Sequence, residues 1–357
     1  MAVRKKIKVL MVDDLEVAVM AIEHIVNQQP DMVLYASAAN PYDAVKVISK
    51  EKPDVILLDI QMPKMDGLTF LRKIMSQHPV PVVMFSGVAE KGSSNAIKAL
   101  QLGAVSILPK PKSIINNFEF HQELVTTLRN AYAVKDRINK LIDRHTLVGN
   151  MNSPFTDSSL KKKRESDSPT DKVIAIGAST GGTQALHYIL DRLPANVMGI
   201  VIVQHMPGNF TRWFAESLDN SSALKVYEAK PGMVLHKGMA VVANGFYHLI
   251  LKKTPNEYVV TTHDGPIVNR HKPSVDELFK SVAKTAGSNG IGILLTGMGD
   301  DGAAGLLEMK KSGAITIAQD DHSAVVFGMP QAAIKINAAK MVMNLNEIIN
   351  FIKNIDL

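Results

Sequence analysis

The sequence predicts an α/β fold with two doubly wound parallel-sheet domains joined by a linker. Residues 1–130 and 171–357 both alternate short apolar runs with segments whose apolar residues recur at three- and four-residue spacing, which is typical of βα units. Residues 131–170 separate them and include a polar stretch rich in Ser and Pro with a KKKR cluster, as expected of a linker. A chain of 357 residues is long enough for each domain to bury its own core.

The first domain is predicted to hold five parallel strands with helices on both faces. The expected strands are the apolar runs at residues 7–14, 32–38, 54–60, 81–87 and 104–110. Helices are expected at residues 18–29, 41–51 and 67–77, and a fifth helix from near Asn117 to about Ile142. Because parallel strands are joined by crossover helices, these units predict a doubly wound sheet.

The second domain resumes the same alternation with its own set of strands. These are expected at residues 172–179, 198–205, 238–244, 290–297 and 314–320. Two further runs, at residues 247–253 and 257–263, lie only a few residues apart and predict a β-hairpin inserted in this domain. The two halves share no short repeat, so they are predicted to be separate domains.

The composition is that of a globular protein, with 46% hydrophobic and 21% charged residues. No apolar run approaches the ~20 residues needed to cross a bilayer, and the basic start leads directly into a strand. Without cysteine there is no disulfide, no thiolate metal site and no Cys nucleophile. We therefore expect a cytoplasmic protein that is not inserted in a membrane.

The net charge of +6 raises the possibility of nucleic-acid binding. Much of this charge stands in two short clusters, at residues 4–8 and 161–164, and neither is interleaved with aromatic residues on which bases could stack. Solvated patches explain these clusters better, so no nucleic-acid partner is expected.

Polar residues follow the strands of the first domain at the ends where parallel sheets carry their sites. They are Asp13, Asp14, Asp59, Ser86 and Lys110. Crowded carboxylates repel one another unless a divalent cation or a lysine compensates, and Mg²⁺ suits such an oxygen site. Asp59 could then attack a phosphoryl group, with Mg²⁺ and Lys110 neutralising the charge that develops.

Four motifs, VDD, LLDIQMPKMDG, FSG and LPKP, give residues 5 to about 125 a family resemblance. This segment resembles the flavodoxin-like receiver domain of two-component response regulators. The resemblance implies that Asp59 accepts phosphate from a histidine kinase. It also implies a Mg²⁺ site formed by Asp13, Asp14, Asp59 and the backbone carbonyl of Gln61. Contacts to the phosphoryl group are implied for Ser86 and Lys110. Ile107 departs from the family, because an aromatic switch residue usually stands three positions before the lysine.

The turn after the first strand of the second domain, VIAIGASTGG at residues 173–182, fits three motifs to different degrees. A dinucleotide-binding G-x-G-x-x-G fails because Ser179 stands in place of the second glycine. A P-loop fails because Thr183 stands in place of the lysine. G-x-S-x-G is met by Gly177, Ser179 and Gly181, which predicts a turn that presents a serine nucleophile at the sheet edge.

Two other strand ends supply candidate partners for Ser179. His205 follows the run IVIVQ and is the candidate base, preferred over His187 in the helix after Ser179. The turn TGMGDDG carries Asp300 and Asp301, of which one is expected to orient the base and the other to cap the following helix. Glycines 297 and 299 of this turn are expected to leave their N–H groups free for an oxyanion.

The motifs IGASTGG, VQHMP and TGMGDDGAAG carry a second resemblance, over residues 171 to about 350. They are similar to the Rossmann-like catalytic domain of the chemotaxis protein-glutamate methylesterases. The resemblance implies Ser179 as nucleophile, His205 as general base and Asp301 as the orienting acid. It further implies that the amides of Met298 and Thr180 bind the oxyanion, and that the esterase reaction uses no cofactor.

Together the two resemblances imply a phosphorylation-activated serine esterase. Its substrates would be glutamate methyl esters, and certain glutamines, on methyl-accepting chemotaxis receptors, and a chemotaxis histidine kinase would be its phosphodonor. The receiver is implied to cover the active-site edge until Asp59 is phosphorylated. Two alternatives stay open: a DNA-binding response regulator, and a catalytically silent module that binds receptor or signalling proteins.

Overall fold

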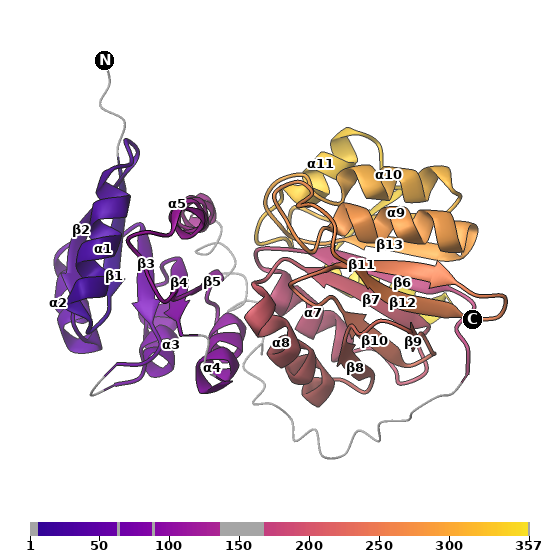
Figure 1. Ribbon diagram of the computed structural model, residues 1–357, viewed down its shortest axis with the longest axis horizontal. Coiled ribbons are helices and arrows are strands. Elements are labelled where there is room, and N and C mark those ends of the chain that lie inside the picture. The colour runs from indigo at the N-terminus through magenta and orange to yellow at the C-terminus, as the bar shows by residue number, and fades with distance from the viewer. Residues whose placement is uncertain (1–5, 63–64, 88–89, 136–167, 356–357) are drawn as a thin grey trace. The chain divides into compact units, whose positions relative to one another are not determined.

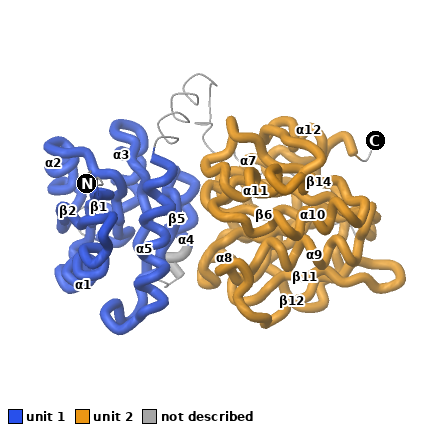
Figure 2. The backbone as a smooth tube through the Cα atoms, turned by 90° about the horizontal axis from the view of Figure 1, so that it is seen from above, with its two compact units in different colours: residues 1–151 blue, residues 152–357 orange. Residues whose placement is uncertain are grey.

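The computed structural model describes residues 6–62, 65–87, 90–135 and 168–355. The chain divides into two compact units, residues Met1–Met151 and Asn152–Leu357, which are coloured separately in Figure 2. Each unit is an α/β structure with a parallel sheet, as predicted. The predicted linker falls mostly on residues 136–167, which lie outside the described residues, so the domain bounds stay a prediction.

The first unit is built on a five-stranded parallel sheet with strand order β2-β1-β3-β4-β5. The strands are β1 Ile7–Val12, β2 Met32–Ala38, β3 Val55–Asp59, β4 Val82–Ser86 and β5 Ser106–Pro109. All five residues of β3 and of β4 are buried, because these strands are covered on both faces.

Helices alternate with these strands and cover both faces of the sheet (Figure 1). They are α1 Glu16–Asn27, α2 Pro41–Lys50, α3 Gly67–Gln77, α4 Glu90–Gln101 and α5 Phe118–Ala133. The Asn117 side chain caps α5 by accepting the Phe120 amide at 3.0 Å, which explains why this helix begins where the sequence predicts. Its predicted extension to residue 142 lies outside the described residues.

The second unit is built on a seven-stranded parallel sheet with strand order β15-β14-β13-β6-β7-β10-β8. The strands are β6 Val173–Ala178, β7 Gly199–Gln204, β8 Lys225–Glu228, β10 Met239–Val242, β13 Gly290–Leu294, β14 Ile315–Gln319 and β15 Met341–Met343. A separate antiparallel sheet has the order β11-β12-β9 and consists of β9 Met233–Val234, β11 His248–Lys253 and β12 Tyr258–His263.

Six α-helices and one 3₁₀ turn complete the described part of this unit. They are α7 Gly182–Leu190, α8 Gly208–Ser221, α9 Val275–Ala286, η2 Gly287–Asn289, α10 Ala303–Lys311, α11 Met329–Lys335 and α12 Leu345–Asn354. Figure 1 shows α9 and α10 on one side of the seven-stranded sheet and α7 and α8 on the other. A strand stands between every two successive α-helices described here, so this part of the chain has no helix-turn-helix.

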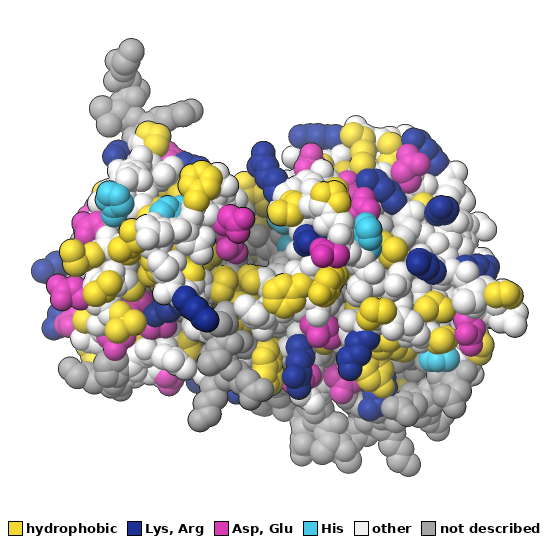
Figure 3. Space-filling view, viewed as in Figure 1, with side chains coloured by type: hydrophobic (Ala, Val, Ile, Leu, Met, Phe, Trp, Pro, Cys, Tyr) yellow, Lys and Arg dark blue, Asp and Glu magenta, His cyan; other side chains and the backbone are white. Residues whose placement is uncertain are grey.

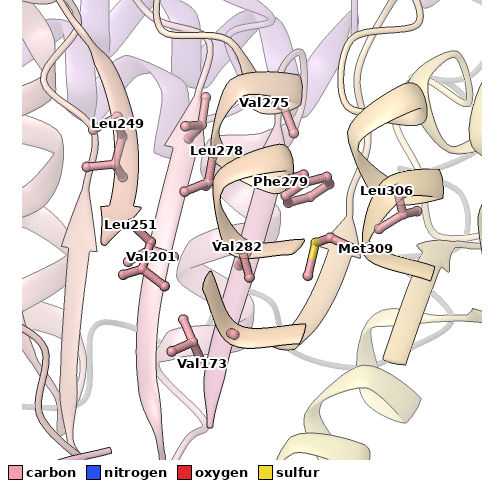
Figure 4. Packing of buried hydrophobic residues seen from close by; sticks show 14 of the residues in the cluster. Val173, Val201, Leu249, Leu251, Val275, Leu278, Phe279, Val282, Leu306 and Met309 are labelled. Atoms are coloured by element: carbon pink, nitrogen blue, oxygen red, sulfur yellow. The ribbon is translucent and has the colours of Figure 1, made fainter. Parts of the chain in front are cut away.

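One face of the seven-stranded sheet is closed by α9, α10 and the predicted hairpin, β11 and β12 (Figure 4). Phe279 and Val282 of α9 belong to one buried cluster with Val173 of β6, and Leu249 and Leu251 bring the hairpin into the same cluster. Burial of this cluster fixes the start of α9 over the sheet, near the carboxyl ends of the central strands.

The sequence did not predict three of the strands, β8, β9 and β15. They have four, two and three residues respectively, too few for a period-two pattern to stand out. Residues within the predicted linker also join the second unit: Pro169 pairs with His236, and the buried Thr170 hydroxyl accepts the Gly199 amide at 3.0 Å.

The surface of the second unit carries mixed charges. On the face seen in Figure 3, Lys and Arg side chains stand among acidic and apolar ones and form no continuous basic stripe. None of the helices in the described ranges is both long and apolar enough to cross a membrane.

Candidate functional site

The first candidate site lies at the carboxyl edge of the five-stranded sheet. The structure brings Asp13, Asp14 and Asp59 together, with one oxygen of each within 4.8 Å of the others. Lys110, which follows β5, reaches into this group and lies 2.8 Å from Asp13 Oδ2 and 2.7 Å from Asp59 Oδ2. The predicted cluster therefore forms, with its positive charge supplied by the lysine.

Burial sets the electrostatics of this cluster. It raises the pKa of the Asp59 carboxyl, and the Asp13 charge adds to this, although hydrogen bonding and attraction from Lys110 pull the other way. Burial also acts to lower the pKa of Lys110, but its hydrogen bonds to the two carboxylates outweigh this and the pKa is raised. Lys110 therefore stays charged beside the Asp59 carboxylate.

The remaining residues predicted for this site lie around Asp59. The Gln61 amide donates to Asp59 Oδ1 at 3.2 Å, which places the loop after β3 at the carboxylate. Ser86 is buried at the end of β4, and its carbonyl accepts the Lys110 amide at 2.8 Å. Ile107 is buried within β5 and pairs in register with Met84, so its side chain is part of the core.

The donor set fits Mg²⁺. Three carboxylates that lie close together, one of them exposed, offer oxygen ligands and leave room for water, as this ion requires. The Lys110 ammonium shows that the site already needs a positive charge for its carboxylates to lie so close.

The second candidate site begins at the turn after β6. Gly181 at φ 80° turns the chain into α7, and the Ser179 carbonyl accepts the Gly182 amide at 2.8 Å. Gly177 has a different role from the predicted one: it lies in β6, where a Cβ would lie 2.1 Å from Val275 Cγ1. It therefore permits close packing of α9, while Gly181 forms the turn.

Two side chains that were not predicted as site residues hold this turn in place. Gln204 Nε2 donates to the Ser179 and His205 carbonyls at 2.9 and 3.0 Å. Thr296 accepts the Ser179 amide through its carbonyl at 3.0 Å and donates its hydroxyl to the Thr180 carbonyl at 2.8 Å. Both residues are buried. Each is a polar residue at the end of an apolar run, and that pattern was the signal in the sequence that could have identified them.

The candidate base and acid form a pair. His205 Nε2 lies 2.8 Å from Asp301 Oδ2, and both side chains are buried. The other ring nitrogen, Nδ1, is also buried and has no hydrogen-bond partner within the described residues. In the same part of the chain, no hydrogen bond joins the Ser179 hydroxyl to His205.

Asp301 is held at the amino-terminal end of α9. Its carboxylate accepts the Ser274 hydroxyl at 2.8 Å, the Val275 amide at 2.7 Å and the Asp276 amide at 3.2 Å. Asn269 Nδ2 adds a donor at 3.0 Å. Burial alone would raise the pKa of the Asp301 carboxyl, but the hydrogen bonds outweigh it and hold this pKa well below its ordinary range.

The depressed pKa of Asp301 predicts a loss of stability in acid. The carboxyl group titrates lower in the folded state than in the unfolded chain, where its pKa is about 3.9. Its contribution to the unfolding free energy is therefore complete above that pH and is lost as the pH falls below it. Urea unfolding followed by the fluorescence of Trp213, the single tryptophan, reports on the second unit.

The comparison that isolates this effect is with Asp301→Asn. The difference in unfolding free energy between the unchanged chain and this variant should be largest near neutral pH and should shrink as the pH falls toward about 3. A difference that stayed constant over this range would show that the carboxylate charge contributes nothing.

The two amides predicted to bind an oxyanion flank the serine. Neither the Thr180 nor the Met298 N–H donates a hydrogen bond to any residue that the structure describes. Gly297 packs directly on Ser179, since a Cβ there would lie 2.7 Å from Ser179 Cβ, and this brings Met298 next to the serine. The Gly297 amide, expected to be free, instead donates to the Val326 carbonyl at 3.0 Å, so that expectation was wrong.

The two other candidates, His187 and Asp300, do not take part in the His205–Asp301 pair. Among its contacts, His187 hydrogen-bonds to Ser217 and Ser221 of α8, and burial lowers the pKa of this histidine to about 4, as expected of a structural residue. The expected helix cap was wrong: neither aspartate side chain caps α10, whose N-cap is Gly302. Asp301 binds the start of α9 instead, and Asp300 is exposed.

Family models match both halves of the chain. The model described as "CheB methylesterase" matches residues 174–352, which include all the candidate residues of the second site. The model described as "Response regulator receiver domain" matches residues 9–117, which include the carboxylate cluster and Lys110.

Relatives are similar over nearly the whole chain. A protein-glutamate methylesterase/protein-glutamine glutaminase of Geobacter metallireducens is 46% identical over 350 residues, 96% of this chain and 97% of its own. One from Pseudomonas syringae pv. tomato shows the same identity and coverage. The crystal structure of the Thermotoga maritima CheB methylesterase catalytic domain is 36% identical with a TM-score of 0.51, and the match covers 52% of this chain and 98% of that one.

Proposed function

Since the chain belongs to the CheB methylesterase family and carries a receiver domain, we propose that Ser179, His205 and Asp301 perform its esterase reaction. By this membership the protein is a protein-glutamate methylesterase and protein-glutamine glutaminase of chemotaxis signalling. The observation that carries the residue assignment is the 2.8 Å contact between His205 and Asp301, which leaves His205 Nδ1 buried and unpaired near the Ser179 turn.

The first step is acylation of Ser179. The hydroxyl oxygen bonds to the ester carbonyl carbon of a glutamyl methyl ester, and its proton passes to His205 Nδ1. Asp301 accepts a hydrogen bond from His205 Nε2–H, which fixes the tautomer with Nδ1 free to act as the base and stabilises the imidazolium. The protonated His205 then gives its proton to the departing methoxide, so methanol leaves and an acyl-enzyme remains.

The second step reverses these roles. Water gives a proton to His205 and bonds to the acyl carbon, and Ser179 leaves with the proton, which releases a glutamate carboxylate. A glutamine side chain follows the same course with ammonia as the leaving group. In both steps the Met298 and Thr180 amides bind the oxyanion, a role supported by their lack of any other acceptor in the described residues.

In the receiver, we assign Asp59 as the phosphoacceptor. The phosphoryl group of a histidine kinase would transfer to its carboxylate, with Lys110 and Ser86 contacting the transferred group. Asp13, Asp14, Asp59 and the Gln61 carbonyl would hold Mg²⁺, which neutralises negative charge at the phosphoryl oxygens when bound. Because position 107 holds an isoleucine that is buried in the core, the activating change would not use an aromatic side chain at this position.

Membership of the family supports a proposal for the substrates and the location. We propose that the glutamates lie on the cytoplasmic helices of methyl-accepting chemotaxis receptors, and that a chemotaxis histidine kinase supplies the phosphoryl group. The enzyme would therefore act in the cytoplasm. The esterase reaction needs no cofactor in this proposal, since Ser179, His205 and two amides supply every group that it uses.

The proposal is tested by methanol release from methylated receptor, with and without acetyl phosphate and Mg²⁺. We expect the phosphodonor to raise the rate for the unchanged protein and to have no effect on Asp59→Asn, which lacks the acceptor oxygen. Mass spectrometry of the intact chain should show a phosphoryl group on the unchanged protein alone.

A matched control is Asp43→Asn, which removes a carboxylate paired with Lys46 on the surface of α2 and should leave the response intact. Phosphorylation of Asp59→Asn would remove Asp59 from the proposal. A rate that did not respond to phosphodonor in the unchanged protein would remove the regulation and leave the esterase assignment standing.

A further inference from the structure

A second histidine lies directly on the proposed base. The rings of His205 and His271 are stacked, with centroids 3.7 Å apart and an interplanar angle of 12°. His271 comes from the segment before α9, and His205 from the end of β7, so the contact joins parts of the chain that are 66 positions apart (271 minus 205). His271 lies outside the motifs that predict the two sites.

The backbone holds His271 in this place by a tight turn. Val268 and His271 exchange hydrogen bonds, N–H to carbonyl, at 3.1 and 2.8 Å. The two residues between them, Asn269 and Arg270, have φ values of 50° and 69°. These lie in the left-handed region, which residues other than glycine adopt infrequently. Strained backbone of this kind persists where the surroundings fix it, and it is concentrated at functional sites.

The same turn is anchored on the other partner of His205. Asn269 Nδ2 donates to Asp301 Oδ1 at 3.0 Å and to Asp276 Oδ2 at 2.7 Å. The turn at residues 268–271 therefore contacts both members of the His205–Asp301 pair, one through an amide and the other through a ring.

The hydrogen bond to Asp301 fixes only one atom of the His205 ring, so it leaves the ring plane free to tilt. We propose that His271 is a positioning residue for the esterase reaction: its stacked ring fixes the plane of His205 so that Nδ1 is directed at the Ser179 hydroxyl. This inference rests on the proposed function of Ser179 and His205.

The charge state of His271 agrees with this role. Burial lowers the pKa of His271 to about 4, and repulsion from His205 and Arg270 acts in the same direction against attraction from Asp301. At neutral pH the ring is uncharged, and its π face can lie against the imidazolium that His205 forms during the reaction.

The test compares His271→Ala and His271→Phe in the full chain, using kcat and KM for methylated receptor, with kcat normalised to the folded fraction. We expect kcat of His271→Ala to fall about 10- to 100-fold, the cost of a displacement of about 1 Å, with KM nearly unchanged. His271→Phe keeps a ring that can stack and should recover kcat to within about threefold of the unchanged protein.

The exposed His263 of β12 gives a matched control, and His263→Ala should retain the unchanged kcat. If His271→Ala does not fold, His271→Gln replaces it, because it has a polar side chain without a ring and must show the same loss. Full kcat in the ringless variant, or an equal loss in His271→Phe, would overturn the positioning role.

Ser179→Ala in the same assay separates this inference from the function on which it rests. If Ser179→Ala is inactive while the ringless His271 variant is fully active, only the inference about His271 fails. If Ser179→Ala remains active, the proposed nucleophile itself is wrong, whatever the His271 variants do.

Discussion

Replacing Ser179 with alanine should lower kcat for methanol release by a factor of about 10⁶, the loss seen when a serine nucleophile of a triad is removed. The expectation follows from the geometry of the turn, in which the Gln204 and Thr296 side chains hold the Ser179 and Thr180 carbonyls while the serine hydroxyl makes no hydrogen bond to any described residue. Because these contacts involve the backbone, the variant should fold normally.

The measurement needs a serine variant that leaves the site untouched. Ser288 is exposed in η2, before the amino-terminal end of β13, at the opposite edge of the sheet from the Ser179 turn. Ser288→Ala should release methanol at the unchanged rate. Activity of Ser179→Ala within tenfold of the unchanged protein would exclude Ser179 as the nucleophile, and another group would have to form the acyl-enzyme.

Asp301→Asn should have the next largest effect, lowering kcat by about 10⁴-fold because an amide can hold the His205 ring in the wrong tautomer. This variant should also lose stability. The carboxylate accepts the Ser274 hydroxyl and the Val275 and Asp276 amides, and an asparagine has only one oxygen to offer these donors. Each buried donor left unpaired costs about 1–3 kcal/mol of unfolding free energy.

The neighbouring Asp300 provides the control for this prediction, since its side chain is exposed. Asp300→Asn should change neither kcat nor the urea midpoint followed by Trp213 fluorescence. If Asp301→Asn lost activity but kept its full stability, the α9 contacts would not contribute to the fold as the structure implies. If it kept its activity, the orienting role would be excluded.

The sequence predicted the sites better than their supports. Asp59 ends a strongly apolar run in the first unit, and Ser179 and His205 follow such runs in the second. Parallel strands bring such positions to one edge of their own sheet, so the residues that meet at each site could be predicted without coordinates. The supports depend on loops. Asn269 and His271 reach the pair through a turn that contains neither glycine nor proline. Of its four residues only Asn269 is of a type that tolerates a left-handed backbone, which is too weak a signal to predict the turn.

The role of Asp301 illustrates a second limit. The sequence suggested a cap for the helix that follows this residue, because capping is usually local. In the structure the Asp301 carboxylate instead accepts hydrogen bonds from the first turn of α9, which lies about 25 positions earlier in the chain. A pattern was present, since Ser274 and Glu277 have the spacing of a capping box, but it locates only the start of the helix and not the carboxylate bound there.

The position of Asp301 at the start of α9 also limits how this enzyme could lose its activity in evolution. A substitution at Ser179 or His205 removes chemistry and leaves the hydrogen bonds of α9 in place, so a catalytically silent descendant could tolerate it. A substitution at Asp301 exposes the same descendant to unfolding and degradation as well. Inactive copies of this domain should therefore retain the aspartate long after the serine has drifted.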